Sequence, residues 1–190
     1  FLPDPPRAHS FHKIQREELN PLNGPFVLPG EYQVTLGING KDVATKSVMV
    51  LGDPLIPITD SDRRALHDTL MTLQGMQRAA YEAAGAANLL SEQMNAVQNV
   101  LETVANPPAG IKTASEALAS RITDLQSRLV APQGERGGLP SKIGALKTSI
   151  WGSTSLPTEA QMRNVDELGK ELEKAVNDAN SEISVGMPQF

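Results

Sequence analysis

The sequence predicts a mainly α-helical protein, an antiparallel three-helix bundle with long helices, preceded by a β-hairpin that completes an Ig-like sandwich. Three patterns along the 190 residues predict it. Prolines crowd residues 1–30, apolar and polar residues alternate over 31–54, and apolar residues recur every three or four positions over 59–186. These patterns are typical of an extended segment, a pair of half-buried strands and amphipathic helices, in that order.

The first thirty residues contain six prolines: Pro3, Pro5, Pro6, Pro21, Pro25 and Pro29. Proline fixes φ and has no backbone N–H, so it disfavours helix interiors and central strands. We expect this segment to be extended and to lie along another surface, because it cannot build a core alone.

The predicted hairpin turns at Asn39-Gly40, the preferred pair for a type I′ turn, in which both central residues need positive φ. Before the turn, Tyr32, Val34 and Leu36 alternate with polar or small residues, and the return strand runs from Val43 to Val50. A two-stranded hairpin is marginally stable in water at best, so this one needs a sheet to join. Tyr32, Val34 and Leu36 are therefore interaction candidates, and we expect the remaining strands to lie outside this sequence.

A long helix is predicted from one unbroken apolar stripe between Asp62 and Val104. Twelve positions keep the 3/4 spacing of an amphipathic helix. At about 1.5 Å per residue, about forty residues extend about 60 Å, which exceeds the diameter of a compact domain. Thr59, Asp60 and Ser61 precede the stripe as N-cap candidates.

Further helical stripes follow, separated by helix-breaking sequence. Asn106-Pro107-Pro108 ends the long helix, and a second stripe runs from Ile111 to Leu129. A glycine-rich loop over 131–138 and a short helical segment from Ile143 to Trp151 come next.

The last stripe, from Met162 to Ile183, begins at a capping box formed by Thr158 and Gln161. We expect the short segment and this last stripe to form the third arm of the bundle, interrupted around residues 152–157.

Small residues cluster in the middle of the long helix, where Ala80, Ala83, Ala84 and Ala87 surround Gly85. They are interaction candidates, because small side chains let another helix or a partner approach closely. The favoured interpretation is a tight crossing within the bundle, with small residues facing large ones. Gly85 costs up to about 1 kcal/mol relative to alanine in a helix, and we expect close packing to explain it.

Trp151, the only tryptophan, is a further interaction candidate, although a cap on the end of the bundle is favoured over a ligand platform. Glu167 and Glu171 lie four residues apart with Lys170 between them, which is typical of a charged helix face in solvent.

The sequence predicts no catalytic, cofactor-binding or metal-binding residue. It has no cysteine, and a net charge of −5 with dispersed Lys and Arg disfavours a nucleic-acid surface. No apolar run reaches the about 18 residues of a membrane-spanning helix. His9 and His12 share a His-x-x-His spacing without further ligands nearby. His67 beside Asp68 is interpreted as solvated, because sequence neighbours point to different faces of a helix.

Several short motifs occur in order along the chain. Gly24 to Leu36 reads Gly-Pro-Phe-Val-Leu-Pro-Gly-Glu-Tyr-Gln-Val-Thr-Leu, Asn39–Lys41 marks a turn, and Asp53-Pro54 ends a strand. Helix starts follow at Thr59–Asp62 and Pro157–Gln161. This succession resembles the C-terminal region of bacterial sortilin-like, BNR-repeat β-propeller proteins, although the Asp-box repeats of the propeller itself are absent here.

The resemblance implies a non-catalytic C-terminal accessory or structural domain of a larger exported protein, extracellular or periplasmic. It would act in packing, self-association or partner docking. Its partners would be the upstream propeller and Ig-like strands, in the same polypeptide or in another chain, with a homo-oligomer as a further option. Such proteins are often labelled glycosyl hydrolases through the propeller, so no catalytic residue and no cofactor is carried over to this segment.

Two other functions stay open. A self-assembling or filament subunit would complete its sheet by strand exchange and helix packing. A glycan-acting hydrolase would need a cleft with two carboxylates about 5–10 Å apart.

Overall fold

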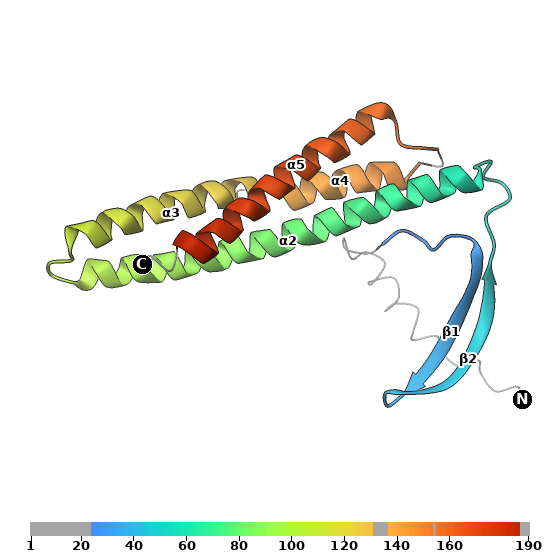
Figure 1. Cartoon of the computed structure of the whole chain (residues 1–190), viewed down its shortest axis with the longest axis horizontal. Helices are drawn as coiled ribbons and strands as arrows, with labels where there is room; N and C mark the ends of the chain where they lie inside the picture. Colours follow the sequence, from blue (N-terminus) through green and yellow to red (C-terminus); the bar gives the residue numbers. More distant parts are fainter. Residues whose placement is uncertain (1–23, 131–136, 154, 187–190) are drawn as a thin grey trace, which may run out of the picture.

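A computed structural model describes residues 24–130, 137–153 and 155–186. The chain is mainly helical, as predicted, with a β-hairpin projecting from one end of a long helical bundle (Figure 1). The elements in chain order are β1 (Gly30–Ile38), β2 (Lys41–Val50), α2 (Asp60–Thr103), α3 (Ala109–Leu129), α4 (Leu139–Trp151), α5 (Glu159–Ser181) and the short π-helix η1 (Glu182–Gly186).

The hairpin forms as predicted. Asn39 and Gly40 have φ of 51° and 75°, the positive values that a type I′ turn requires. Strands β1 and β2 pair antiparallel, but the register shifts after Leu36, because Leu36 lies opposite Ala44 whereas Gly37 lies opposite Asp42. Val43 is therefore an extra residue in β2, a β-bulge that the alternation of the sequence does not reveal. Within the described residues this hairpin is the only sheet, so the Ig-like sandwich stays a prediction.

The long helix α2 confirms the prediction from the apolar stripe. Its N-cap is Thr59, one of the predicted candidates, whose side-chain oxygen accepts a hydrogen bond from the Asp62 backbone N–H at 3.1 Å. The helix ends at Thr103, and Val104 is already extended before the Pro107-Pro108 pair.

The described residues contain four helices beside the π-helix, one for each predicted stripe, but their predicted grouping into a three-helix bundle is not confirmed. Helix α3 returns along the far half of α2, and α4 continues in the same direction along the half near the hairpin (Figure 1). Helix α5 then runs back across them. The chain therefore keeps its direction from α3 to α4 and reverses between α4 and α5, so α4 and α5 do not form the predicted interrupted third arm.

Local hydrogen bonds explain this reversal. The Gly152 backbone N–H bonds to the Thr148 carbonyl at 3.1 Å and closes α4. Thr158 then starts α5 with the predicted capping box, in which the Gln161 backbone N–H donates to the Thr158 hydroxyl and the Gln161 side chain accepts from the Thr158 backbone N–H. Because α4 ends and α5 begins with separate local hydrogen bonds, these bonds do not fix the direction of α5, and packing decides it.

The core is thicker near the hairpin than at the far end of the bundle. Near the hairpin, α2 packs against α4 and α5, with Leu73, Leu139 and Ile143 fully buried. Farther out, α2 packs against α3 alone through a small cluster: Leu90, Met94, Leu118 and Ile122. The bundle thus narrows to a two-helix arm.

Candidate functional site: an exposed face of the hairpin

One face of the hairpin is apolar and forms the candidate interaction surface. Cross-strand partners point to the same side of a sheet, so the register places one set of side chains together. We call this set the hairpin face, and it consists of Tyr32, Val34, Leu36, Ala44, Lys46 and Val48. The predicted candidates Tyr32, Val34 and Leu36 are its β1 half.

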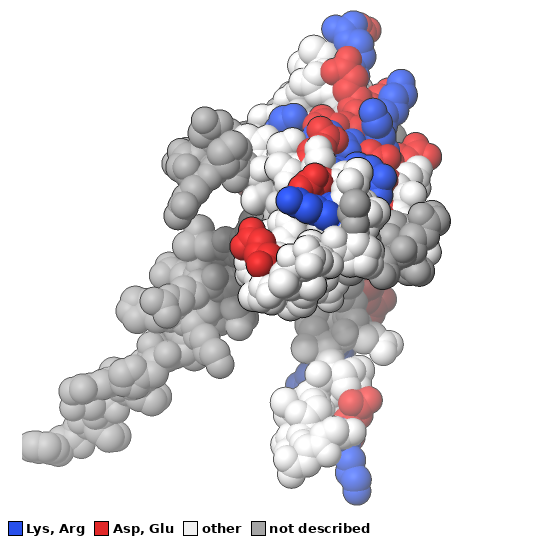
Figure 2. Space-filling model, turned by 90° about the vertical axis from the view of Figure 1, so that its left-hand side faces the viewer, with Lys and Arg blue, Asp and Glu red and all other residues white. Residues whose placement is uncertain are grey.

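The hairpin face is open to solvent. Val34 is 59% exposed, Leu36 56% and Val48 45%, whereas the aliphatic side chains of the bundle core are almost fully buried. In Figure 2 the hairpin lies below the bundle and shows mostly uncharged atoms, while the bundle surface above it carries intermixed acidic and basic side chains. Exposed aliphatic side chains gathered on one face of a sheet are typical of an interaction site.

The opposite face of the hairpin is mainly polar, although it also carries Met49, which is 61% exposed. The Thr35 and Thr45 hydroxyl groups lie 2.9 Å apart in a hydrogen bond, and the Ser47 hydroxyl donates to the Glu31 carboxylate. An antiparallel sheet with one apolar and one polar face normally packs its apolar face on a core. Here the apolar face has no covering layer among the described residues.

The β2 half of the hairpin face could not be identified from the sequence. Pairing counted straight back from the Asn39-Gly40 turn would put Thr45 and Ser47 on the apolar side. The bulge at Val43 moves them to the polar side and brings Ala44, Lys46 and Val48 to the hairpin face, because a one-residue shift exchanges the two faces of a strand.

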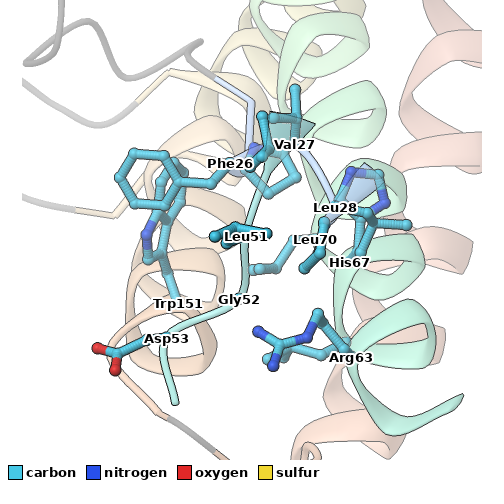
Figure 3. Close-up of a pocket in the computed structure, with 14 residues that line it drawn as sticks. Phe26, Val27, Leu28, Leu51, Gly52, Asp53, Arg63, His67, Leu70 and Trp151 are labelled. Carbon is cyan, nitrogen blue, oxygen red and sulfur yellow. The ribbon is translucent and has the colours of Figure 1, made fainter. Parts of the chain in front are cut away.

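Contacts of Phe26 with Trp151 and of Gly52 with Arg63 hold the base of the hairpin to the bundle, and Figure 3 labels these residues. The Phe26 and Trp151 rings meet edge to face, with centroids 5.6 Å apart and an interplanar angle of 79°. Within the hairpin base itself, the Tyr32 hydroxyl donates to the Leu28 carbonyl at 2.7 Å. At the end of β2, Gly52 lies so close to Arg63 that an added Cβ would come within 3.2 Å of its guanidinium.

Between these contacts a cavity of about 410 Å³ separates the hairpin base from the start of α2 and the end of α4. It is lined mainly by apolar side chains, with Arg63 and His67 from α2 (Figure 3). The prediction that His67 is solvated is wrong, because its side chain is only 24% exposed beneath the hairpin base, with Nδ1 3.5 Å from the Asp68 carboxylate. The first turns of α2 face the hairpin base, and this contact cannot be deduced from the sequence of α2 alone.

The four alanines named as candidates lie inside the bundle. Ala80, Ala83, Ala84 and Ala87 all belong to its main core, as the favoured interpretation requires. Gly85 corrects the expectation of close packing, since it is exposed and no atom lies within 4 Å of the position that a Cβ would occupy. The glycine instead borders an open hollow that Leu129 of α3 and Pro140 of α4 also line.

Trp151 is the last residue of α4. It is partly buried against the main core, and it meets the hairpin base through Phe26. On α5, Glu171 forms an ion pair with Lys142 of α4 at 3.1 Å, so it links two helices.

The described part of the chain contains neither a metal-binding cluster nor a membrane-spanning helix. There, no three His, Asp or Glu side chains are grouped closely enough to hold a metal ion, and His9 and His12 lie outside it. No described helix is both long and apolar enough to cross a membrane.

Comparison with protein-family models, curated proteins and solved structures finds no match to this chain. The resemblance to sortilin-like, BNR-repeat proteins and the extracellular or periplasmic location that it implies therefore stay predictions.

Proposed function

We propose that this chain is a non-catalytic structural module whose hairpin completes a β-sheet with strands from another stretch of polypeptide. This is the role expected of an accessory domain in a larger exported protein. The observation that carries the proposal is the exposed hairpin face, which leaves Val34, Leu36 and Val48 in water beside a well-packed bundle. Covering that face would remove apolar surface from water and stabilise a hairpin that is marginal alone.

The bundle supports the hairpin in this role. The middle parts of its apolar stripes are buried within the chain, and α2 and α5 start at side-chain N-caps. The contacts around Phe26, Trp151 and Gly52 attach the hairpin to the bundle without covering the hairpin face. The bundle therefore carries the two strands with the hairpin face open to a partner.

Hydrogen exchange tests the proposal by comparing two samples, the isolated 190-residue chain and the protein purified from its natural source. In the isolated chain, kept dilute enough to exclude self-association, we expect the β1 and β2 amides to exchange fast, because an open hairpin is a region of low local stability. In the natural-source protein the same amides should exchange about a hundredfold more slowly or better, since the added strands raise the free energy of opening.

Amides in the core of α2 around Leu73 provide the internal control and should exchange equally slowly in both samples. Equal exchange of the hairpin amides in the two samples would contradict the proposal. An intact mass of the natural-source protein under denaturing conditions then tells whether the added strands belong to the same polypeptide or to another chain.

A further inference from the structure

The two outer edges of the hairpin differ in how well they are protected from pairing. Strand β2 carries Lys41, Asp42 and Lys46, and the bulge at Val43 breaks its regular register. Lys46 also points to the hairpin face, opposite Val34. Charged residues, inward-pointing lysines and bulges are the devices by which sheet proteins protect an edge strand from further pairing. Strand β2 therefore has the features of a terminal strand.

Strand β1 has none of these devices beyond its start. Its only charged residue is Glu31, and the stretch from Gln33 to Ile38 is uncharged. The sheet in the described part of the chain has the order β1-β2, so the outer edge of β1 is unpaired there. The unpaired N–H and C=O groups of such an edge are a template for another strand.

The sequence of β1 is complementary to itself when two copies run antiparallel with Val34 opposite Val34. In that register Tyr32 lies opposite Leu36 of the second copy, and Gln33 lies opposite Thr35 of the second copy. Glu31 lies opposite Gly37 of the second copy, so no like charges face each other. Aromatic–aliphatic and uncharged polar pairs of this kind stabilise a sheet, whereas like charges directly opposite destabilise it.

We propose that β1 pairs with β1 of a second copy in this register, giving a two-fold symmetric, four-stranded sheet of order β2-β1-β1-β2. This pairing rests on the proposed function, which makes the hairpin the interaction surface. It adds that the outer edge of β1 binds a second copy of the same chain. Pairing at the edge leaves the hairpin faces of both copies on the same side of the larger sheet. Strands from another polypeptide therefore still have the apolar face to cover.

Sedimentation velocity on the isolated chain over a wide range of concentration tests the pairing. The parent chain should show a reversible monomer–dimer equilibrium. The double variant Gln33→Lys with Thr35→Lys places lysine opposite lysine twice across the two-fold axis, and it should dimerise about tenfold more weakly. Both substitutions lie on the polar face, so the hairpin face is unchanged.

The matched control is the double variant Thr45→Lys with Ser47→Lys. It adds the same charge to the same polar face, but on β2, which lies about two strand spacings, or about 10 Å, from the second copy. Its dimerisation should equal that of the parent. The variant Gln33→Glu with Thr35→Lys places opposite charges across the axis and should dimerise at least as well as the parent.

A parent chain that stays monomeric at all concentrations would overturn the pairing, as would equal weakening by the β1 and β2 lysine variants. Either result leaves the proposed function untouched, because hydrogen exchange in the natural-source protein tests that separately. Dimerisation that is insensitive to all of these variants would place the contact elsewhere on the molecule and would also overturn the inference.

Discussion

The hairpin and the bundle are built from the same kind of pattern and end in opposite environments. Both carry regularly spaced aliphatic residues on one face, yet Leu73 of α2 is fully buried whereas Leu36 of β1 is 56% exposed. The difference lies in where the covering surface comes from. Helices α3, α4 and α5 cover α2, but no described segment covers the hairpin face. Periodicity therefore identifies an apolar face without telling whether its partner belongs to the same chain.

The largest expected effect comes from shortening one leucine in each region. Leu73→Ala should lower the free energy of unfolding by about 2–5 kcal/mol, because it leaves a cavity in the thick part of the core. Leu36→Ala should change it by less than about 0.5 kcal/mol in the isolated chain, as is usual for an exposed side chain. Urea denaturation followed by helical circular dichroism measures both. A loss for Leu36→Ala as large as that for Leu73→Ala would show that the hairpin face is covered within the isolated chain.

A second pair of variants sharpens the comparison inside the bundle. Gly85→Ala should raise the free energy of unfolding by about 0.5–1 kcal/mol, since alanine is the better helix former and the space around the new methyl group is open. Gly144→Ala should lack this gain, because its Cβ would lie 2.6 Å from Nε2 of the buried Gln77 side chain. Thermal denaturation of the two variants measures both changes in stability. Equal gains in stability would mean that the Gln77 side chain moves aside without cost.

A smaller effect is expected at the ion pair that joins α3 to α5. Arg128 bonds to Asp178 at 2.7 Å, and both side chains are partly exposed. Asp178→Asn should lower the free energy of unfolding by about 0.5 kcal/mol, because solvent screens the pair and Asp124 still lies 3.2 Å from Arg128. The loss should shrink in high salt. Denaturation at low and high ionic strength measures it, and a loss that is independent of salt would point to packing as the cause.

The last prediction concerns how stability depends on pH. Burial lowers the pKa of the Lys147 ammonium below its usual 10.5. Between the lowered pKa and 10.5 the unfolded chain binds more protons than the folded one, so stability rises with pH across that window. Lys147→Met should therefore lack this rise, so its stability relative to that of the parent should fall as the pH approaches 10.5. Urea denaturation across this range checks it, and a difference that stays constant would assign the effect to packing alone.

The sequence predicts the local elements well because local signals set them. The apolar stripe of α2, the Asn39-Gly40 turn and the capping box of Thr158 with Gln161 each act within one or two turns of the chain, and the structure confirms all three. The same signals could not predict direction. Glycine and proline mark where α4 ends and α5 begins, but packing decides that α3 and α4 lie end to end while α5 reverses.

The candidate surface could be predicted only in part for a related reason. The β1 half follows from alternation, whereas the β2 half depends on the bulge at Val43, which has no local signature. The contact between Phe26 and Trp151 joins positions far apart in the sequence, and no periodicity connects them. Gly85 shows the opposite error, because a glycine in mid-helix suggested close packing where the structure has open space.

Because α2 is one unbroken helix, a small rotation at its junction with the hairpin gives a large displacement at its far end. Its 44 residues, at about 1.5 Å each, place the far tip of the bundle about 66 Å from the junction with the hairpin. A rotation of about 10° at that junction would displace the tip by about 11 Å, by simple geometry over this length. The few contacts around Phe26, Trp151 and Gly52 thus set the position of everything attached to the distant end, and a change in any of them is magnified there.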